Sequence, residues 1–302
     1  MRKVVQFELW KDCSNACQFC FNSNLIKKSS TDDKIEQIQF VKNFIQSNSI
    51  QDYNIVGLIG GEFFDTQLST LDVYENFCSL IELLSQKLKN GIIDQVWLAT
   101  ALMYESIDCL KTVLDIFLAH NCIDKVLICT SYDTRGRFFA NKEQIWKNNM
   151  KILKSMFPQI KLHTEMIITQ DLVDKVINDD FDIVSFQKQY DTHIDFLEPH
   201  CGFKFQNKQE HMKVLPWFYP TRKSFMDFMK KLSSVSSIIN DEFLSANTRS
   251  HTLFMQDGCS LTKFDNRNLK QTTLPCDIPN KNGYSDSDVE MRKDVEEFLE
   301  NI

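Results

Sequence analysis

Short segments rich in Val, Ile, Leu and aromatic residues recur along the first two thirds of the chain and alternate with longer amphipathic segments. Apolar runs of this length, bounded by polar residues, are typical of β-strands. Six strands are expected, at residues 4–10, 54–60, 95–100, 125–131, 161–168 and 182–187. The second and fourth are nearly continuous apolar runs, which indicates strands that are buried on both faces.

The segments between these strands repeat apolar residues at spacings of three and four, which predicts helices with one apolar face. The expected helices cover residues 33–47, 68–88, 106–118, 142–156, 171–177 and 223–239. Asp33 and Glu36 are predicted to form a capping box at the start of the first helix, and Ser106 to cap the third.

Strands that alternate with helices pair in parallel through right-handed crossovers. We therefore expect an α/β fold, a partial (β/α)6 barrel over residues 1–190. Residues 191–302 would form an insert (191–221), the last barrel helix and a C-terminal region that contacts substrate or caps the barrel. Within this region, residues 252–275 resemble a β-hairpin turning at 265–268, and an acidic tail begins at residue 286.

The composition is that of an ordinary globular protein, with 302 residues, 43% hydrophobic and 25% charged. A formal net charge of −7 does not favour a nucleic-acid partner, which would need a basic face. The sequence shows neither an apolar run long enough to cross a membrane nor a secretory leader, so we expect a cytoplasmic protein with no membrane partner.

Three of the ten cysteines lie within eight residues, at Cys13, Cys17 and Cys20. A structural zinc site would need a fourth ligand, and no second Cys-x2-Cys pair follows. A disulfide would leave one thiol over and conflicts with a reducing compartment. An iron–sulfur cluster held by three thiolates would leave one iron open for a ligand. The trio follows the first strand directly, at the barrel edge where active sites are built.

The spacing Cys13-x3-Cys17-x2-Cys20, with Phe19 before the third cysteine, resembles the signature of the radical S-adenosylmethionine (radical SAM) enzymes. The resemblance implies that the three cysteines bind a [4Fe–4S] cluster. Its open iron would chelate S-adenosylmethionine, whose reductive cleavage gives a 5′-deoxyadenosyl radical that abstracts hydrogen from a small-molecule, nucleotide or peptide substrate. An electron donor such as flavodoxin or ferredoxin is also implied.

Gly60, Gly61 and Glu62 end the second strand. Neither glycine has a Cβ, which permits close backbone approach, and Glu62 is an acceptor suited to an ammonium group. The stretch resembles the Gly-Gly-Glu motif with which the family holds the amino group of S-adenosylmethionine. Thr100, at the end of the third strand, is a further candidate for a polar contact.

The fourth strand ends in Ser131 and Asp133, which resemble the family's ribose-binding pair. Arg135 or Arg137 would bind the cofactor's carboxylate. Ile168, at the end of the fifth strand, would present its backbone to the adenine, although the family's Gly-x-Ile-x-Gly pattern is absent here. The resemblance covers residues 1 to about 190.

The last third offers less. Trp217, Phe218 and Tyr219 would either stack on a planar substrate or cap the core, and capping is the commoner use of such a run. The remaining scattered cysteines, among them Cys201, Cys259 and Cys276, are not expected to hold a second cluster. The alternative to an enzyme is a nonenzymatic binding protein stabilised by zinc at the cysteine trio.

Overall fold

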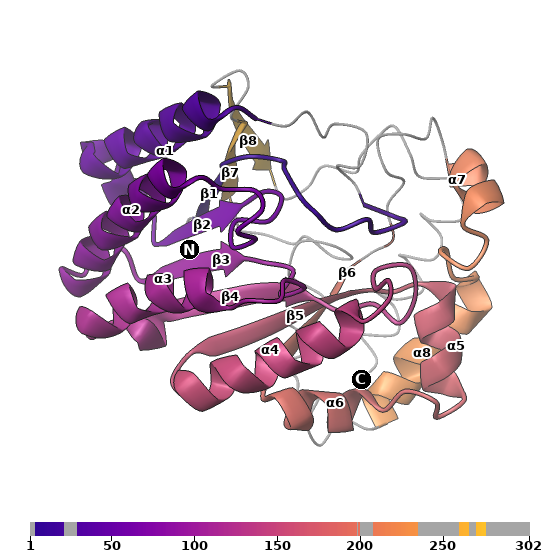
Figure 1. The fold of residues 1–302 in the computed structure, drawn as a ribbon. Helices are drawn as coiled ribbons and strands as arrows, with labels where there is room; N and C mark the ends of the chain where they lie inside the picture. Colours follow the sequence, from indigo (N-terminus) through magenta and orange to yellow (C-terminus); the bar gives the residue numbers. More distant parts are fainter. Residues whose placement is uncertain are drawn as a thin grey trace.

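A computed structural model describes residues 4–20, 29–197, 199, 208–234, 260–265 and 270–275. These residues form an α/β fold built on one eight-stranded sheet, in the order β6-β5-β4-β3-β2-β1-β7-β8 (Figure 1). The strands are β1 (Val4–Glu8), β2 (Ile55–Ile59), β3 (Gln95–Ala99), β4 (Val126–Ser131), β5 (Lys161–Ile167), β6 (His193–Leu197), β7 (Ser260–Asp265) and β8 (Lys270–Pro275).

Neighbouring strands from β1 to β6 pair in parallel, as do β1 and β7, and only β8 runs antiparallel, beside β7. The six-stranded parallel part alternates with helices and is consistent with a partial barrel. The strands predicted near residues 4, 54, 95, 125 and 161 are confirmed, as is the β7–β8 hairpin. Asp265, the first residue of the turn predicted at 265–268, ends β7, and the rest of this turn and the acidic tail lie outside the described residues.

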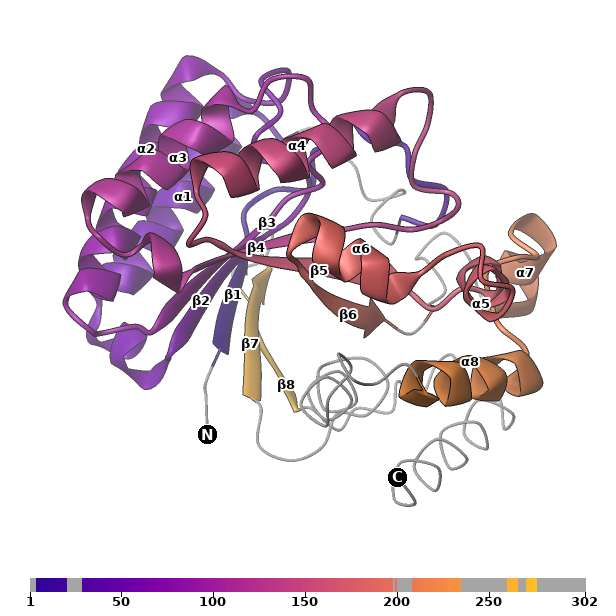
Figure 2. The ribbon, with the colours of Figure 1, turned by 90° about the horizontal axis from the view of Figure 1, so that it is seen from below.

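Most of the helices lie along one side of the sheet (Figure 2). They are α1 (Thr31–Gln46), α2 (Leu71–Lys89), α3 (Asp108–Ala119), α4 (Lys142–Met156), α5 (Gln170–Ile177), α6 (Ile183–Tyr190), α7 (Lys208–Val214) and α8 (Arg222–Ser234). Alternate strand residues face them and are almost fully buried, for example Val56 and Leu58 on β2 and Ile194 on β6. This core contains most of the apolar surface that folding removes from water, and so it holds the strands in place.

The prediction of a strand at 182–187 was wrong. This segment is helix α6: the Asp182 side chain accepts a hydrogen bond from Ser185 N at 3.0 Å, which caps the helix start. Phe186 and Tyr190, four residues apart, pack on Trp146 of α4. A short apolar run fits either a buried strand or one face of a helix, and here the tertiary contacts decide. The sixth strand is β6, within the stretch predicted to be irregular.

Two helix starts also differ from the prediction. The capping box of α1 is formed by Ser30 and Asp33, not by Asp33 and Glu36, because the helix begins two residues earlier than expected. The N-cap of α3 is Ile107 rather than Ser106, although Ser106 Oγ still accepts a hydrogen bond from the amide of Asp108 at 3.2 Å. Helix α8 is described to residue 234, and its predicted end at 239 lies beyond the described part.

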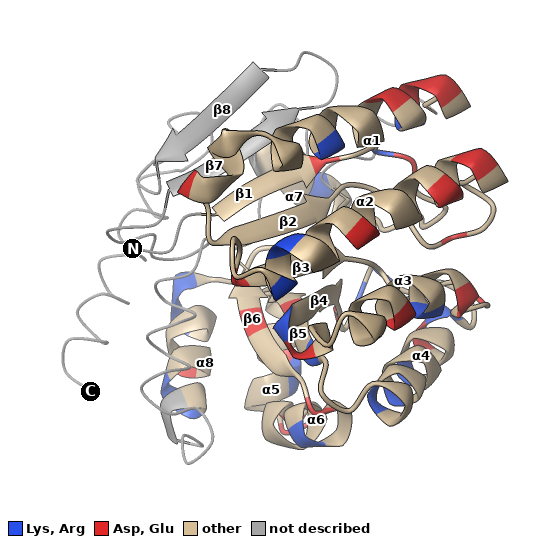
Figure 3. Ribbon diagram, turned by 90° about the vertical axis from the view of Figure 1, so that its left-hand side faces the viewer, with Lys and Arg blue, Asp and Glu red and all other residues tan. Residues whose placement is uncertain are grey.

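Acidic residues are concentrated at the starts of α1 and α2, where they interact favourably with the positive end of the helix dipole (Figure 3). Both basic and acidic residues occur on the other helices. None of the helices in the described part of the chain combines the length and apolar character needed to cross a bilayer.

Candidate functional site

The three cysteines lie in the loop that follows β1, at the carboxyl edge of the sheet. Leu9 N donates to Ile59 O at 3.1 Å and prolongs the β1–β2 pairing up to this loop. Cys17 and Cys20 share a tight turn, with Cys20 N donating to Cys17 O at 3.2 Å. All three thiols are free and partly buried. Residues 21–28, which complete the loop, lie outside the described part.

The thiols lie close to charged groups on other strands. Burial raises the pKa of Cys13 to about 11, and the nearby Glu62 carboxylate and Cys17 add to this shift. Burial also raises the pKa of Cys17, while the Arg137 guanidinium opposes the shift. Cys17 therefore interacts electrostatically with both Cys13 and Cys20.

Three thiols in one loop are a donor set suited to a soft metal centre or an iron–sulfur cluster. Among the described residues, however, no three His, Cys, Asp or Glu side chains stand together as a group that could hold a metal ion. The donor chemistry therefore fits a cluster, and binding one would have to draw the three thiols together around it.

Gly60 and Gly61 bring the end of β2 against the cysteine loop. Gly61 N donates to Trp10 O at 2.7 Å, and Glu62 N donates to Asp12 O at 2.8 Å. A Cβ on Gly61 would lie 1.9 Å from Asp12 O, and one on Gly60, whose φ is +152°, would lie 2.2 Å from Trp10 O. The absence of a Cβ on these glycines therefore lets the end of β2 lie directly against the backbone of the cysteine loop.

Glu62 is fully buried at the centre of this arrangement. Its carboxylate accepts hydrogen bonds from Phe64 N at 3.1 Å, Ala101 N at 2.7 Å and Thr100 Oγ1 at 2.9 Å. Burial raises its pKa to about 7 even though these hydrogen bonds lower it. The structure therefore brings the predicted residues Glu62 and Thr100 into direct contact and places their pair near Cys13.

At the end of β4, Asp133 and Arg137 form a buried ion pair with a 2.5 Å contact. Asp133 also accepts from Ile167 N at 2.9 Å. Arg137 Nη1 lies 3.8 Å from Cys17 Sγ, and its guanidinium lies 5.3 Å from the centre of the Phe19 ring. Of the two arginines considered, Arg137 is the one at the cysteine loop.

The other predicted residues of this edge make contacts with groups outside the cysteine loop. Arg135 is about half exposed and lies over the Trp217 ring at 5.0 Å. Ser131 Oγ lies 3.5 Å from Glu165 Oε2, facing β5. The Ile168 side chain is buried in the core, and its amide donates to Leu197 O at 2.8 Å.

The Pro216–Pro220 segment packs on the cysteine loop. Phe19 stacks on Phe218 with ring centres 5.5 Å apart and meets Trp217 edge-on at 6.3 Å. Leu215 and Tyr219 complete this small apolar cluster. These aromatic residues pack on Phe19 in a small cluster apart from the main core, and they fix one side of the cysteine loop.

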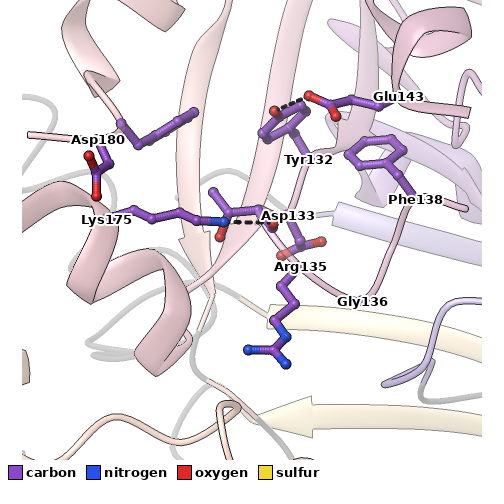
Figure 4. Close-up of a pocket in the computed structure, with 10 residues that line it drawn as sticks. Tyr132, Asp133, Arg135, Gly136, Phe138, Glu143, Lys175 and Asp180 are labelled. Atoms are coloured by element: carbon purple, nitrogen blue, oxygen red, sulfur yellow. Dashed lines mark hydrogen bonds between the residues drawn. The ribbon is translucent and has the colours of Figure 1, made fainter. Parts of the chain in front are cut away.

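A cavity of about 320 Å³ opens beside the β4–α4 loop (Figure 4). It is lined by Asp133 and Arg135 together with Tyr132, Glu143 and Lys175. Lys175 Nζ donates to the carbonyl oxygen of Thr134 at 3.0 Å, and Tyr132 Oη donates to Glu143 at 2.7 Å. The lining does not include the cysteines or Glu62, so the cavity adjoins the cysteine loop without containing it.

A scan of protein-family models and a search of curated proteins find no match to this chain.

Sequence reasoning missed the polar face of β5 and β6, where His163, Glu165, His193 and Asp195 lie close together. The available signal was the alternation of polar and apolar residues in both strands. On β6 this alternation extends over only five residues, which lie in the stretch predicted to be irregular.

Proposed function

We propose that this protein is a radical SAM enzyme with a partial (β/α)6 barrel, in which Cys13, Cys17 and Cys20 hold a [4Fe–4S] cluster. The observation that carries the proposal is the placement of three free thiols in one loop at the carboxyl edge of a parallel sheet, against the ends of β2 and β4. When bound, the cluster supplies the electron that cleaves S-adenosylmethionine to a 5′-deoxyadenosyl radical for hydrogen abstraction from substrate.

The chain's own residues would prepare this site in several ways. Arg137, beside Cys17, offsets negative charge on the thiolates. Asp133 holds Arg137 in place at the end of β4. Asp133 would bind the ribose together with Ser131, and Arg137 would bind the carboxylate of the cofactor. Gly60, Gly61 and Glu62 fix the loop from the β2 side and place a carboxylate near Cys13, where an ammonium group would be bound.

The packing of Phe19 under Phe218 would shield the loop from water. A one-electron donor such as flavodoxin or ferredoxin is a required partner, and the substrate would be a small molecule, a nucleotide or a peptide. We place the enzyme in the cytoplasm, because free thiols persist in a reducing compartment.

Anaerobic loading with iron and sulfide tests the proposal. The wild-type chain should bind about four iron atoms and gain visible iron–sulfur absorption, and after reduction it should cleave S-adenosylmethionine to 5′-deoxyadenosine. Cys13→Ala, Cys17→Ala and Cys20→Ala should each lose cluster and cleavage. Cys78→Ala and Cys109→Ala, which alter partly buried thiols on α2 and α3, are the matched controls and should retain both.

The proposal fails if the chain takes up no iron, or if the control cysteines matter as much as the trio. One tightly held zinc per chain, with unfolding of Cys20→Ala, would instead support a zinc-stabilised binding protein.

A further inference from the structure

The two faces of the parallel sheet differ in chemistry. On β5 and β6, the residues that face the helices are buried and mostly apolar, such as Leu162, Met166 and Phe196. The alternate residues face the opposite, concave side and are only partly buried. Both strands carry acidic positions (Figure 3). Polar side chains on a sheet face that only formed part of the core would destabilise the fold. At the carboxyl half of parallel strands, a polar face is typical of a ligand site.

Parallel register aligns four polar side chains on this concave face. His163 lies opposite His193, and Glu165 lies opposite Asp195. His163 Nδ1 lies 2.9 Å from Asp195 Oδ2, and His193 Nε2 lies 3.4 Å from Asp195 Oδ1. The imidazole rings are 4.8 Å apart. The side chains of His163, His193 and Asp195 are 24–34% exposed, so a ligand can reach them.

The two carboxylates have different surroundings. Burial by itself raises the pKa of Asp195, but hydrogen bonds from His163 and His193 bring it below its usual value. Asp195 is therefore ionised and already engaged. For Glu165, burial and then the charge of Asp195 raise the pKa to about 7. Its contact from Ser131 Oγ, at 3.5 Å, is long for a hydrogen bond.

His163 adds a second acceptor. The Asp195 carboxylate can only accept, so His163 donates its Nδ1–H to it, and in the tautomer that carries its proton on Nδ1 the ring has an acceptor, Nε2, on its other side. Glu165 and His163 lie two residues apart on β5 and project to the same face. Together they offer acceptors, beside an ionised Asp195, to a group that brings positive charge and N–H donors.

We propose that the concave face of β5 and β6 binds a protonated amine of the substrate, with Glu165 and His163 Nε2 as its acceptors. A cation there would relieve the repulsion between Glu165 and Asp195, and an ammonium brings three donors. A metal ion is disfavoured because His163 and His193 are both turned toward Asp195, and the described residues contain no metal-holding group. An anionic group would face two carboxylates.

This inference deepens the proposed function, because it names the chemical class of the substrate. The charge of Arg137 lowers the pKa of Glu165, and the charge of Asp133 raises it. The amine site and the cysteine loop are therefore neighbours across the end of β4. Binding of an amine, however, requires no cluster, and the two proposals can therefore fail separately.

The test uses the 302-residue chain without added iron, and 1,4-diaminobutane as the probe, with uncharged 1,4-butanediol as its matched control. Histidine Cε1–H NMR signals report on the site, and calorimetry gives the affinity. The diamine should shift the His163 and His193 signals saturably, and the diol should not. Glu165→Gln should weaken diamine binding at least tenfold, whereas Glu36→Gln, at an exposed position on α1, should leave it unchanged.

His163→Gln, which keeps a polar side chain of similar reach, should also weaken binding, by threefold or more. Circular dichroism verifies that each variant is folded. The NMR titration of the wild-type chain tests amine binding even if a variant does not fold. The inference is overturned if the diamine gives no saturable shift, if the diol binds equally well, or if Glu165→Gln binds as tightly as wild type. None of these results depends on iron uptake, so they do not affect the cluster proposal.

Discussion

Single residues set the character of the candidate site through buried charge. Glu62, Asp133, Arg137 and Glu165 all lie within the sheet's carboxyl edge, where removal from water must be offset by hydrogen bonds or by an opposite charge. Asp133 and Arg137 satisfy each other. Glu165 is partly buried and has weaker support, since its contact from Ser131 is long and the Arg137 charge does not outweigh burial and the charge of Asp195. A carboxylate in such surroundings destabilises the fold, and groups of this kind are concentrated at binding sites.

The pH dependence of stability should reveal Glu165. Its pKa is raised from 4.5 in the unfolded chain to about 7 in the folded one, so the folded state binds the proton more tightly. The stability it contributes is complete below pH 4.5 and is lost as the pH rises toward 7. Glu165→Gln removes this dependence. The free energy of unfolding of the variant, relative to that of wild type, should therefore be about 1–3 kcal/mol higher at pH 8 than at pH 5.

Urea unfolding at the two pH values measures this difference. Glu36→Gln, at an exposed helix position, is the control and should show almost none of it. A Glu165→Gln variant whose stability relative to wild type is the same at both pH values would mean that this carboxylate is not perturbed in the folded chain.

At the level of elements, helix α1 anchors the cysteine loop. Asp12, one residue before Cys13, pairs with Lys34 of α1 at 2.7 Å, and both side chains are almost fully buried. Asp12 also accepts from Ser29 N at 2.9 Å, which ties the far end of the loop to its beginning. The Lys34 ammonium lies 5.4 Å from the centre of the Trp10 ring. The helix thus fixes both ends of the segment that carries the thiols.

Removing Asp12 should therefore be costly. Asp12→Ala leaves the Lys34 charge buried without its partner, and we expect a loss of about 3–5 kcal/mol in the free energy of unfolding. The exposed pair Lys111–Asp115 on α3 provides the comparison, and Asp115→Ala should cost at most about 1 kcal/mol. Denaturant unfolding of both variants decides the matter, and similar losses would show that the buried pair is not an anchor.

The whole molecule brings together loops that are far apart in sequence. The ends of β1, β2 and β4 meet at one edge because parallel strands all point the same way, and the Pro216–Pro220 segment packs on the cysteine loop at this edge. The site is consequently assembled only in the folded chain. Any group that it binds selectively should stabilise the fold as a whole.

Loading with iron and sulfide should accordingly raise the melting temperature of the wild-type chain. We expect a rise of at least about 4 °C, which corresponds to 1–2 kcal/mol for a chain of this size. Cys17→Ala should show no rise, and Cys78→Ala should show the full rise. Calorimetry under anoxic conditions gives both values, and an unchanged wild-type transition would argue against a cluster bound by the folded loop.

Local pattern was enough for much of the fold. The long amphipathic helices α2 and α4 and the apolar strands β2 and β4 were predictable because many residues repeat the same period. The segment 182–187 was too short for its period to be distinguished, and packing on Trp146 made it helical. β6 was missed because two of its five residues, His193 and Asp195, are polar, and they are explained only by a partner strand with the same alternation.

The α/β alternation, the three-thiol loop after the first strand and the Gly-Gly-Glu turn after the second could be predicted without coordinates, since each depends on residues adjacent in the chain. The fold was needed to show that Arg137 rather than Arg135 meets the thiols, that the two glycines abut the cysteine loop, and that His163, Glu165 and Asp195 share one face. These contacts join residues dozens of positions apart, which strand register and side-chain packing bring together and local sequence does not encode.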